Sequence, residues 1–487
     1  MTRSRLLRGT AAFAVAAILQ RAAPPLLLLV FARVLSPSDF GQIGVATTVA
    51  AALTVVVSLG LETAVFRGYV LAAAVPERVR AFVGTVGTVA VAVPLLASIA
   101  FSLAAAPAVA ELVRVPTDVI RLAAIGAAFG ASATIVPLAL LRAQNRLGSY
   151  LRLTALQVVI LPALAVAFVW VFRWGATGWM ASYAIGNAIL LARGLVMVRR
   201  DWAPVFDRHE LRLALAFGLP LVPHAIAHWG LSVSDRAILG AYVSAADVGA
   251  YYAAFLFGLP VALIATALSQ AAQPLYAMAA ADPERRVGLG RVMTVHALAV
   301  GLATAAIALL GPPTILALLP GEYARAAAVL PWLAVGGGLF GLYLIPMNVT
   351  ALVVGRTTWV WLITGTAAAV NIGLNLIFVP QFGLGAAAVN TTIGYAALLV
   401  GHALYAQRLK PPQLRLEGRH VSAGLAVICV PAAIGAVVGP QDSAGGFIVR
   451  VVLLVAAASA VLLLSPWREE ARAVIRSLRS ADAAGQP

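Results

Sequence analysis

Two stretches that lie far apart in the chain share one pattern of residues. They are RVLSPSDFGQIG at 33–44 and AYVSAADVGAYY at 241–252. The matching positions are Ser36, Asp39 and Gly41 in the first stretch and Ser244, Asp247 and Gly249 in the second, and each pair is 208 residues apart. Serine or aspartate can cap the start of a helix, and glycine allows a tight turn with close packing. The constant spacing predicts two copies of one unit, each with this turn between its first two helices.

A second pair of glycines keeps the same spacing. Gly175 in FRWGATGWMAS and Gly383 in VPQFGLGAAAVN are also 208 residues apart. Between these anchors, TIVPLALLRAQNR resembles YLIPMNVTALVVGR, which places Pro137 opposite Pro346 with a drift of one residue. The repeat therefore extends from the start of each half to its far end.

The composition predicts a membrane protein. The 487 residues are 62% hydrophobic and 11% charged, far more apolar than soluble domains. The formal net charge is +16, but the basic residues are scattered in short loops, which argues against nucleic-acid binding. The single cysteine, Cys429, excludes a disulfide framework and a cysteine-based metal site.

Runs of about 20 apolar residues predict fourteen membrane helices. They cover residues 9–32, 42–66, 81–106, 118–141, 152–172, 176–197, 212–234, 249–273, 288–311, 326–352, 358–379, 384–406, 421–439 and 447–465. Most of the 34 lysines and arginines fall in alternate loops, so the positive-inside rule predicts that both termini are cytoplasmic. Arg236 and Arg450 are among the few basic residues assigned to the opposite side.

The predicted fold is an all-α integral membrane protein with two parallel six-helix bundles. The bundles cover residues 1–200 and 201–410, helices 13 and 14 lie within 411–466, and a basic cytoplasmic tail follows at 467–487. Each bundle starts in the cytoplasm, so the two are related by an axis along the membrane normal. Such a duplication predicts a cavity between the bundles and transport by alternating access.

The chain also resembles a known family. FARVLSPSDFGQIGVATTVAAALTVVVSLGLETAVFRG at 31–68 is similar to the opening of the bacterial polysaccharide biosynthesis proteins, the Wzx-type flippases, whose second helix ends in Gly-Leu-x-x-Ala. Gly60, Leu61 and Ala64 match that motif. The stretches LLPGEYARAAAVLPWLAVGG and ALVVGRTTWVWLITGTAAAVNIGLNLIFVPQFGLGAAAVNTTIGY together resemble the tenth to twelfth helices of the family. The resemblance covers about residues 5–406.

The resemblance implies membership of the superfamily that includes the multidrug-extruding MATE transporters and the lipid II flippase. It implies a multi-pass protein of the bacterial plasma membrane that moves a polyprenyl-diphosphate-linked oligosaccharide to the outer leaflet, for export of cell-surface polysaccharide. The expected partners are this lipid-linked glycan, membrane lipids, and a polysaccharide polymerase or glycosyltransferases of the same pathway. The family offers no catalytic signature, and no cofactor or metal is expected.

Arg21 is the first candidate site residue, because it lies near the middle of the predicted helix 9–32. A charge at this depth normally faces a bundle interior or an aqueous cavity, and guanidinium suits bidentate contacts with phosphate. A structural ion pair with Glu62 is the alternative. The repeat places His228 and Trp229 opposite Gln20 and Arg21.

His224 and His228 are four residues apart and share a helical face. They could bind phosphate when protonated, respond to pH, or simply form buried hydrogen bonds. Asp235 and Arg236 follow the predicted helix 212–234 and are expected to form a gate or cap on the outer face.

Other polar residues lie within or at the ends of predicted helices. Glu62 is a candidate for coupling to a proton or sodium ion or for an ion pair with an arginine, and Arg67 lies close to it in sequence. The amides of Gln270, Asn371 and Asn375 could bond sugar hydroxyls or neighbouring helices, and bonding between helices is their ordinary role.

Two other functions remain open from the sequence. A MATE-type, cation-coupled antiporter for drugs or metabolites would use the same fold. A membrane glycosyltransferase or polymerase would need acidic catalytic residues or a large external loop, and neither is evident in the chain. We therefore expect a transporter and no enzymatic activity.

Overall fold

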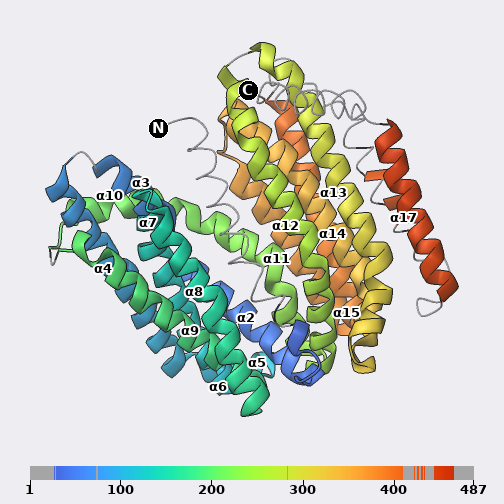
Figure 1. Ribbon diagram of the computed structural model, residues 1–487, viewed down its shortest axis with the longest axis horizontal. Coiled ribbons are helices and arrows are strands. Elements are labelled where there is room, and N and C mark those ends of the chain that lie inside the picture. Colours follow the sequence, from blue (N-terminus) through green and yellow to red (C-terminus); the bar gives the residue numbers. More distant parts are fainter. Residues whose placement is uncertain are drawn as a thin grey trace, which may run out of the picture. The chain divides into compact units, whose positions relative to one another are not determined.

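The computed structural model describes residues 29–72, 75–203, 205–281, 283–409 and 444–464, with isolated positions at 27, 422, 425, 426, 429–431 and 433. This part of the chain is helical, with short turns between the helices (Figure 1). The first half contains α2 (Pro37–Val57), α3 (Leu61–Ala72), α4 (Pro76–Ala104), α5 (Ala106–Val113), α6 (Thr117–Ala133), η1 (Thr134–Leu138), α7 (Ala139–Ala143), α8 (Leu147–Ala165), η2 (Val166–Val171), α9 (Gly175–Val198) and η3 (Arg199–Asp201). The remainder contains α10 (Arg208–Gly218), η4 (Leu219–Leu221), α11 (Val222–Tyr242), α12 (Ala245–Ala281), α13 (Pro283–Leu318), η5 (Gly321–Tyr323), α14 (Ala324–Asn348), η6 (Val349–Val354), α15 (Val360–Arg408) and α17 (Ala444–Leu464).

Ten helical stretches of the described residues are long and apolar enough to cross a membrane. The protein is therefore a multi-pass membrane protein, as its composition predicted, and its described residues form helices joined by turns. The predicted helices at 9–32 and 421–439 fall largely outside the described residues. The count of fourteen crossings and the cytoplasmic location of both termini thus stay predictions.

The Ser-x-x-Asp-x-Gly turn has the same capping hydrogen bonds in both copies. Ser36 caps α2: its hydroxyl accepts a hydrogen bond from the Asp39 amide at 3.1 Å and donates to the Asp39 carboxylate at 2.7 Å. Ser244 makes the same two bonds with Asp247, at 3.1 and 2.8 Å. The prediction that these residues cap helices is confirmed, and each cap stabilises its helix by ~1 kcal/mol.

The glycines of the two turns pack against each other. A Cβ on Gly41 would overlap the carbonyl oxygen of Ala245 and lie 2.9 Å from the amide nitrogen of Gly249. A Cβ on Gly249 would overlap the carbonyl oxygen of Pro37 and lie 3.0 Å from the amide nitrogen of Gly41. The contact is reciprocal, as at a two-fold axis, so only glycine fits at either position.

Two predicted helix boundaries need correction. The predicted helix 42–66 is broken at Leu59 and Gly60, which both have positive φ (49° and 66°). Glycine fits at position 60 because a Cβ there would overlap the carbonyl oxygen of Gly218. The predicted helix 212–234 instead continues to Tyr242, so Asp235 and Arg236 lie inside α11 and do not cap it. Arg450, which the charge pattern assigned to the opposite side, lies inside α17, within the predicted helix 447–465, and is buried.

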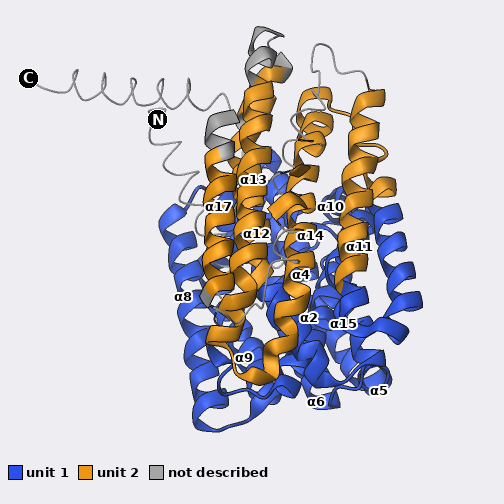
Figure 2. Ribbon diagram, turned by 90° about the vertical axis from the view of Figure 1, so that its right-hand side faces the viewer, with its two compact units in different colours: residues 1–256, 364–387 blue, residues 257–363, 388–487 orange. Residues whose placement is uncertain are grey.

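The chain divides into two compact units, coloured separately in Figure 2. Unit 1 comprises Met1–Leu256 and Thr364–Ala387, and unit 2 comprises Phe257–Ile363 and Ala388–Pro487. Two unit boundaries fall within α15, and the second lies close to Gly383. The φ of 58° and ψ of −133° at Gly383 divide that helix into two, as the separate predicted helices 358–379 and 384–406 require.

Within unit 2, α13 packs against α14 and α17. The helices are joined by buried polar contacts: Asn348 donates to the hydroxyl of Ser269 at 2.9 Å, and Nε2 of His296 lies 3.1 Å from the carbonyl oxygen of Gly341. These contacts join different helices, which is the ordinary role of such groups in membranes.

Candidate functional site

Unit 1 contains a cavity of about 440 Å³, within the size range of small-molecule sites. It lies where the break between α2 and α3 meets α6, η1, α8, α9 and the start of α11. Its polar lining residues are Thr54, Ser58, Glu62, Thr63, Thr134, Gln157, Tyr183 and Asn187. The broken helix contributes the first four of these.

Packing of α6 against α9 brings two of these side chains to the cavity. Gly126 and Gly130 lie four residues apart on α6, and Tyr183 and Asn187 lie four apart on α9, so each pair shares one helical face. Asn187 donates to the carbonyl oxygen of Gly126 at 3.3 Å, and a Cβ on Gly130 would lie 3.3 Å from the Asn187 amide. Small residues at this spacing let membrane helices approach closely.

Among the described residues that line the cavity, Glu62 is the one acidic side chain. Its carboxylate lies 3.7 Å from the guanidinium of Arg142 on α7, and both side chains are 41% exposed. The Arg142 guanidinium also lies 5.0 Å from the centre of the Phe66 ring. The nearby Arg67 is exposed and lies over the Phe217 ring at 4.8 Å. The ion pair of Glu62 therefore joins α3 to α7.

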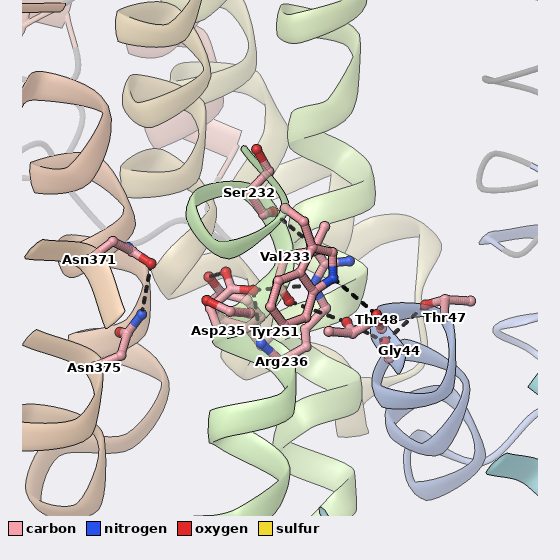
Figure 3. A network of polar contacts seen from close by, with 12 residues as sticks. Gly44, Thr47, Thr48, Ser232, Val233, Asp235, Arg236, Tyr251, Asn371 and Asn375 are labelled. Atoms are coloured by element: carbon pink, nitrogen blue, oxygen red, sulfur yellow. Dashed lines mark hydrogen bonds and ion pairs between the residues drawn. The ribbon is translucent and has the colours of Figure 1, made fainter. Parts of the chain in front are cut away.

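A second polar region lies in unit 1, where α11 packs against α2 and side chains of α11 contact those of α12 (Figure 3). Asp235 and Arg236 are almost fully buried, with 2% and 4% of their side chains exposed. The Asp235 carboxylate lies 3.4 Å from Nε of Arg236 and accepts a hydrogen bond from the hydroxyl of Tyr251. The guanidinium also donates to the Ser232 carbonyl oxygen at 3.1 Å and lies 4.0 Å from the centre of the Phe255 ring.

This arrangement explains why two charges lie inside an apolar helix. The two charges neutralise each other, and hydrogen bonds and an aromatic face satisfy the remaining groups, which reduces the cost of desolvation. The sequence could not show this, because Asp235 and Arg236 read as the polar end of a helix.

The predicted residues of α11 take part in packing. Trp229 donates its indole N–H to the carbonyl oxygen of Thr48 on α2 at 3.1 Å. His228 Nδ1 lies 3.4 Å from the hydroxyl of Ser232, one turn along the same helix. His224 is half-buried and lies next to Ala225, which lines the cavity. Of these three, His224 is nearest in sequence to the cavity wall.

The predicted amides divide between the two units. Asn371 and Asn375 are fully buried in unit 1, and the amide of Asn375 donates to the Asn371 carbonyl at 3.3 Å (Figure 3). Gln270 is exposed and belongs to unit 2. Arg21 lies outside the described residues. Over the part of the chain that the structure describes, no group of three His, Cys, Asp or Glu could hold a metal ion.

The cavity residues that sequence reasoning missed are mostly uncharged. Tyr183, Asn187 and Gln157 lie in otherwise apolar helices, and the spacing of Tyr183 and Asn187 was the available signal. Arg142 is one of the basic residues of the alternate loops, and that charge pattern indicates no partner for it. Its contact with Glu62, 80 residues away in sequence, depends on how α3 and α7 pack.

Solved structures show which fold this is. The lipid II flippase MurJ, in an inward closed conformation, matches with a TM-score of 0.74 and 12% identity, covering 94% of this chain and 99% of that one. An inward-facing multidrug resistance MATE family transporter of the MOP superfamily matches with a TM-score of 0.66 and 15% identity, covering 81% and 96%. The eukaryotic MATE transporter AtDTX14 matches with a TM-score of 0.56 and 13% identity, covering 87% and 99%. At these identities the similarity establishes the fold alone.

The family of this chain is established by a match between its sequence and a family model. No curated protein matches the chain. The family described as "Polysaccharide biosynthesis protein" matches residues 30–328, which is more than half of the chain and includes both copies of the capped turn and every residue that lines the cavity. The chain therefore belongs to the polysaccharide biosynthesis protein family, in a fold shared with MurJ and the MATE transporters.

Proposed function

We propose that the protein is a flippase that moves a polyprenyl-diphosphate-linked oligosaccharide across the bacterial plasma membrane. The observation that carries this proposal is the cavity of unit 1, lined by hydroxyl and amide groups in a membrane protein of a polysaccharide family. In this scheme the predicted bundles, 1–200 and 201–410, alternate access to the two sides of the membrane. Both termini lie in the cytoplasm.

The lining of the cavity suits a glycan. Sugar hydroxyls donate and accept hydrogen bonds, and so do the hydroxyl of Tyr183 and the amides of Gln157 and Asn187. The described lining includes one carboxylate and no cationic side chain. A diphosphate therefore needs a different partner, and the predicted role of Arg21 as a phosphate ligand complements the cavity.

We expect Gln157→Ala to slow transport by about two- to tenfold, the effect of losing one hydrogen bond to the glycan. The measurement uses purified protein in vesicles with a fluorescent polyprenyl-diphosphate oligosaccharide, whose exposure in each leaflet is followed over time. Gln381→Ala is the matched control, because Gln381 also lies in unit 1 but is exposed and outside the cavity.

The outcomes of this assay separate the site from the function. If the wild type flips the lipid and both Gln157→Ala and Gln381→Ala flip it at the same rate, the protein is a flippase but the glycan does not bind in this cavity. Absence of flipping with several glycans, under proton and sodium gradients, would contradict the flippase. Exchange of organic cations by the same vesicles would then support a MATE-type antiporter.

We further expect Glu62→Gln to change transport without unfolding the protein. A half-exposed ion pair contributes at most about 1 kcal/mol, so the thermal unfolding temperature should stay close to that of the wild type. If Glu62 couples transport to an ion, flipping by the variant becomes independent of the gradient. Wild-type response to both gradients in the variant would show that the pair with Arg142 is structural.

A further inference from the structure

A second hollow in unit 1 is cationic. Its volume is about 560 Å³, and it is lined by Tyr69, Gln144, Arg146, Val196, Met197, Arg199, Arg200 and Asp201. Three arginines and one aspartate therefore line it. The lining comes from α3, the link between α7 and α8, and the end of α9 with η3, and Figure 1 shows α3 and α7 side by side.

The hydrogen bonds within the hollow do not neutralise the positive charge of its arginines. The Asp201 carboxylate accepts from the amide of Gln144 at 2.8 Å. Arg146 donates to the side-chain oxygen of Gln144 at 3.1 Å and to the carbonyl oxygen of Met197 at 3.2 Å. No ion pair joins Asp201 to an arginine among the described residues. The Asp201 carboxylate is thus bound by a neutral amide, and the charge of the arginines is available to bind an anion.

The position of the hollow points to a lipid. Its lining residues lie near or just beyond the ends of three apolar spans, which end at Ala72, Ala143 and Asp201. The ends of such spans are expected where the membrane core gives way to headgroups. One wall is apolar, and Val196 is 50% exposed, as a contact for an acyl chain requires. Basic pockets between membrane helices bind anionic headgroups.

We propose that this hollow binds the phosphate of an anionic membrane phospholipid, with Arg146, Arg199 and Arg200 as its ligands. Guanidinium donates two parallel hydrogen bonds to phosphate oxygens, which lysine could not do. The site is separate from the glycan cavity, and its existence does not depend on the identity of the cargo. By the predicted orientation it opens to the cytoplasmic leaflet.

The test is lipid binding to the full-length purified protein, measured by native mass spectrometry. Phosphatidylglycerol and phosphatidylcholine with the same acyl chains are compared at matched concentrations. We expect the wild type to prefer phosphatidylglycerol and the double variant Arg199→Gln/Arg200→Gln to bind it about tenfold more weakly or worse. The control, Arg152→Gln/Arg193→Gln, removes two exposed charges outside the hollow and should keep the preference.

Each alternative has its own result. Equal loss in both double variants would mean that overall positive charge, and not this hollow, attracts the lipid. Equal binding of the two phospholipids by the wild type would overturn the site. If a short prenyl diphosphate binds more tightly than phosphatidylglycerol, and its binding depends on the arginines, the hollow is a site for the cargo instead. If inorganic phosphate competes fully with phosphatidylglycerol, the hollow is a simple anion site. Near-equal thermal unfolding temperatures of the variants verify that each is folded.

Discussion

Replacing Gly41 by alanine is expected to lower the free energy of unfolding by about 3 kcal/mol or more. The added Cβ would overlap the carbonyl oxygen of Ala245 and crowd the amide of Gly249, and main-chain atoms cannot rotate away as a side chain could. Overpacking of a core commonly costs about 1–3 kcal/mol, and a backbone clash belongs to the upper end. Unfolding in detergent, followed by heat or denaturant, gives the measurement.

Two further variants decide whether the reciprocal contact is the cause. Gly249→Ala, at the equivalent position, should destabilise the protein by a similar amount, because its Cβ would overlap the carbonyl oxygen of Pro37. Gly148→Ala is the control: Gly148 lies at the start of α8, and apart from its chain neighbours and the backbone of its own helix no atom lies within 4 Å of the added Cβ. This variant should keep the wild-type stability or raise it slightly. Wild-type stability of Gly41→Ala would show that the crossing of α2 and α12 can widen freely.

Replacing Asp235 by leucine should cost about 3–5 kcal/mol, because it leaves the Arg236 guanidinium buried without its carboxylate. The effect should be far larger than that of Asp118→Leu, which removes an exposed carboxylate from the first turn of α6. Both variants are compared by the unfolding measurement used for Gly41. A loss below about 1 kcal/mol for Asp235→Leu would mean that water or lipid headgroups already reach the pair.

The double variant Asp235→Leu/Arg236→Leu separates the value of the pair from the cost of breaking it. Apolar residues commonly replace a buried ion pair without loss, so this variant should be more stable than Asp235→Leu alone. The Tyr251 hydroxyl would still lack its acceptor on Asp235, and adding Tyr251→Phe should recover part of the remaining deficit. A double variant less stable than the single one would contradict this account.

These two expectations describe how the membrane part of unit 1 is held together. Gly41 and Gly249 allow the backbones of α2 and α12 to touch, and Asp235 fixes Arg236 and Tyr251 between α11 and α12. None of these residues lines the cavity of unit 1. Variants at these positions should therefore affect folding first, whereas Gln157→Ala and Glu62→Gln should affect transport first.

The sequence by itself determined the membrane class, the positions of most helices and the duplicated capping turn. The length of an apolar run and the capping of a helix by serine depend on neighbouring residues in the chain, so both can be recognised in the local sequence. The sequence also placed Glu62 among the candidates and distinguished its two possible roles. It did not predict the break at Gly60. There the chain packs closely against Gly218, which lies 158 residues further along, and such a long-range contact cannot be seen in the local sequence.

Only the tertiary structure decided which groups meet. The pairing of Glu62 with Arg142, the burial of Arg236 beside Asp235, and the approach of Gly41 to Gly249 each join residues through helix packing. The cavity is likewise shared among α2, α3, α6, η1, α8, α9, η4 and α11. In lipid, packing is set by the fit of small residues and by polar contacts between helices, and the apolar pattern that reveals each helix carries little of that information.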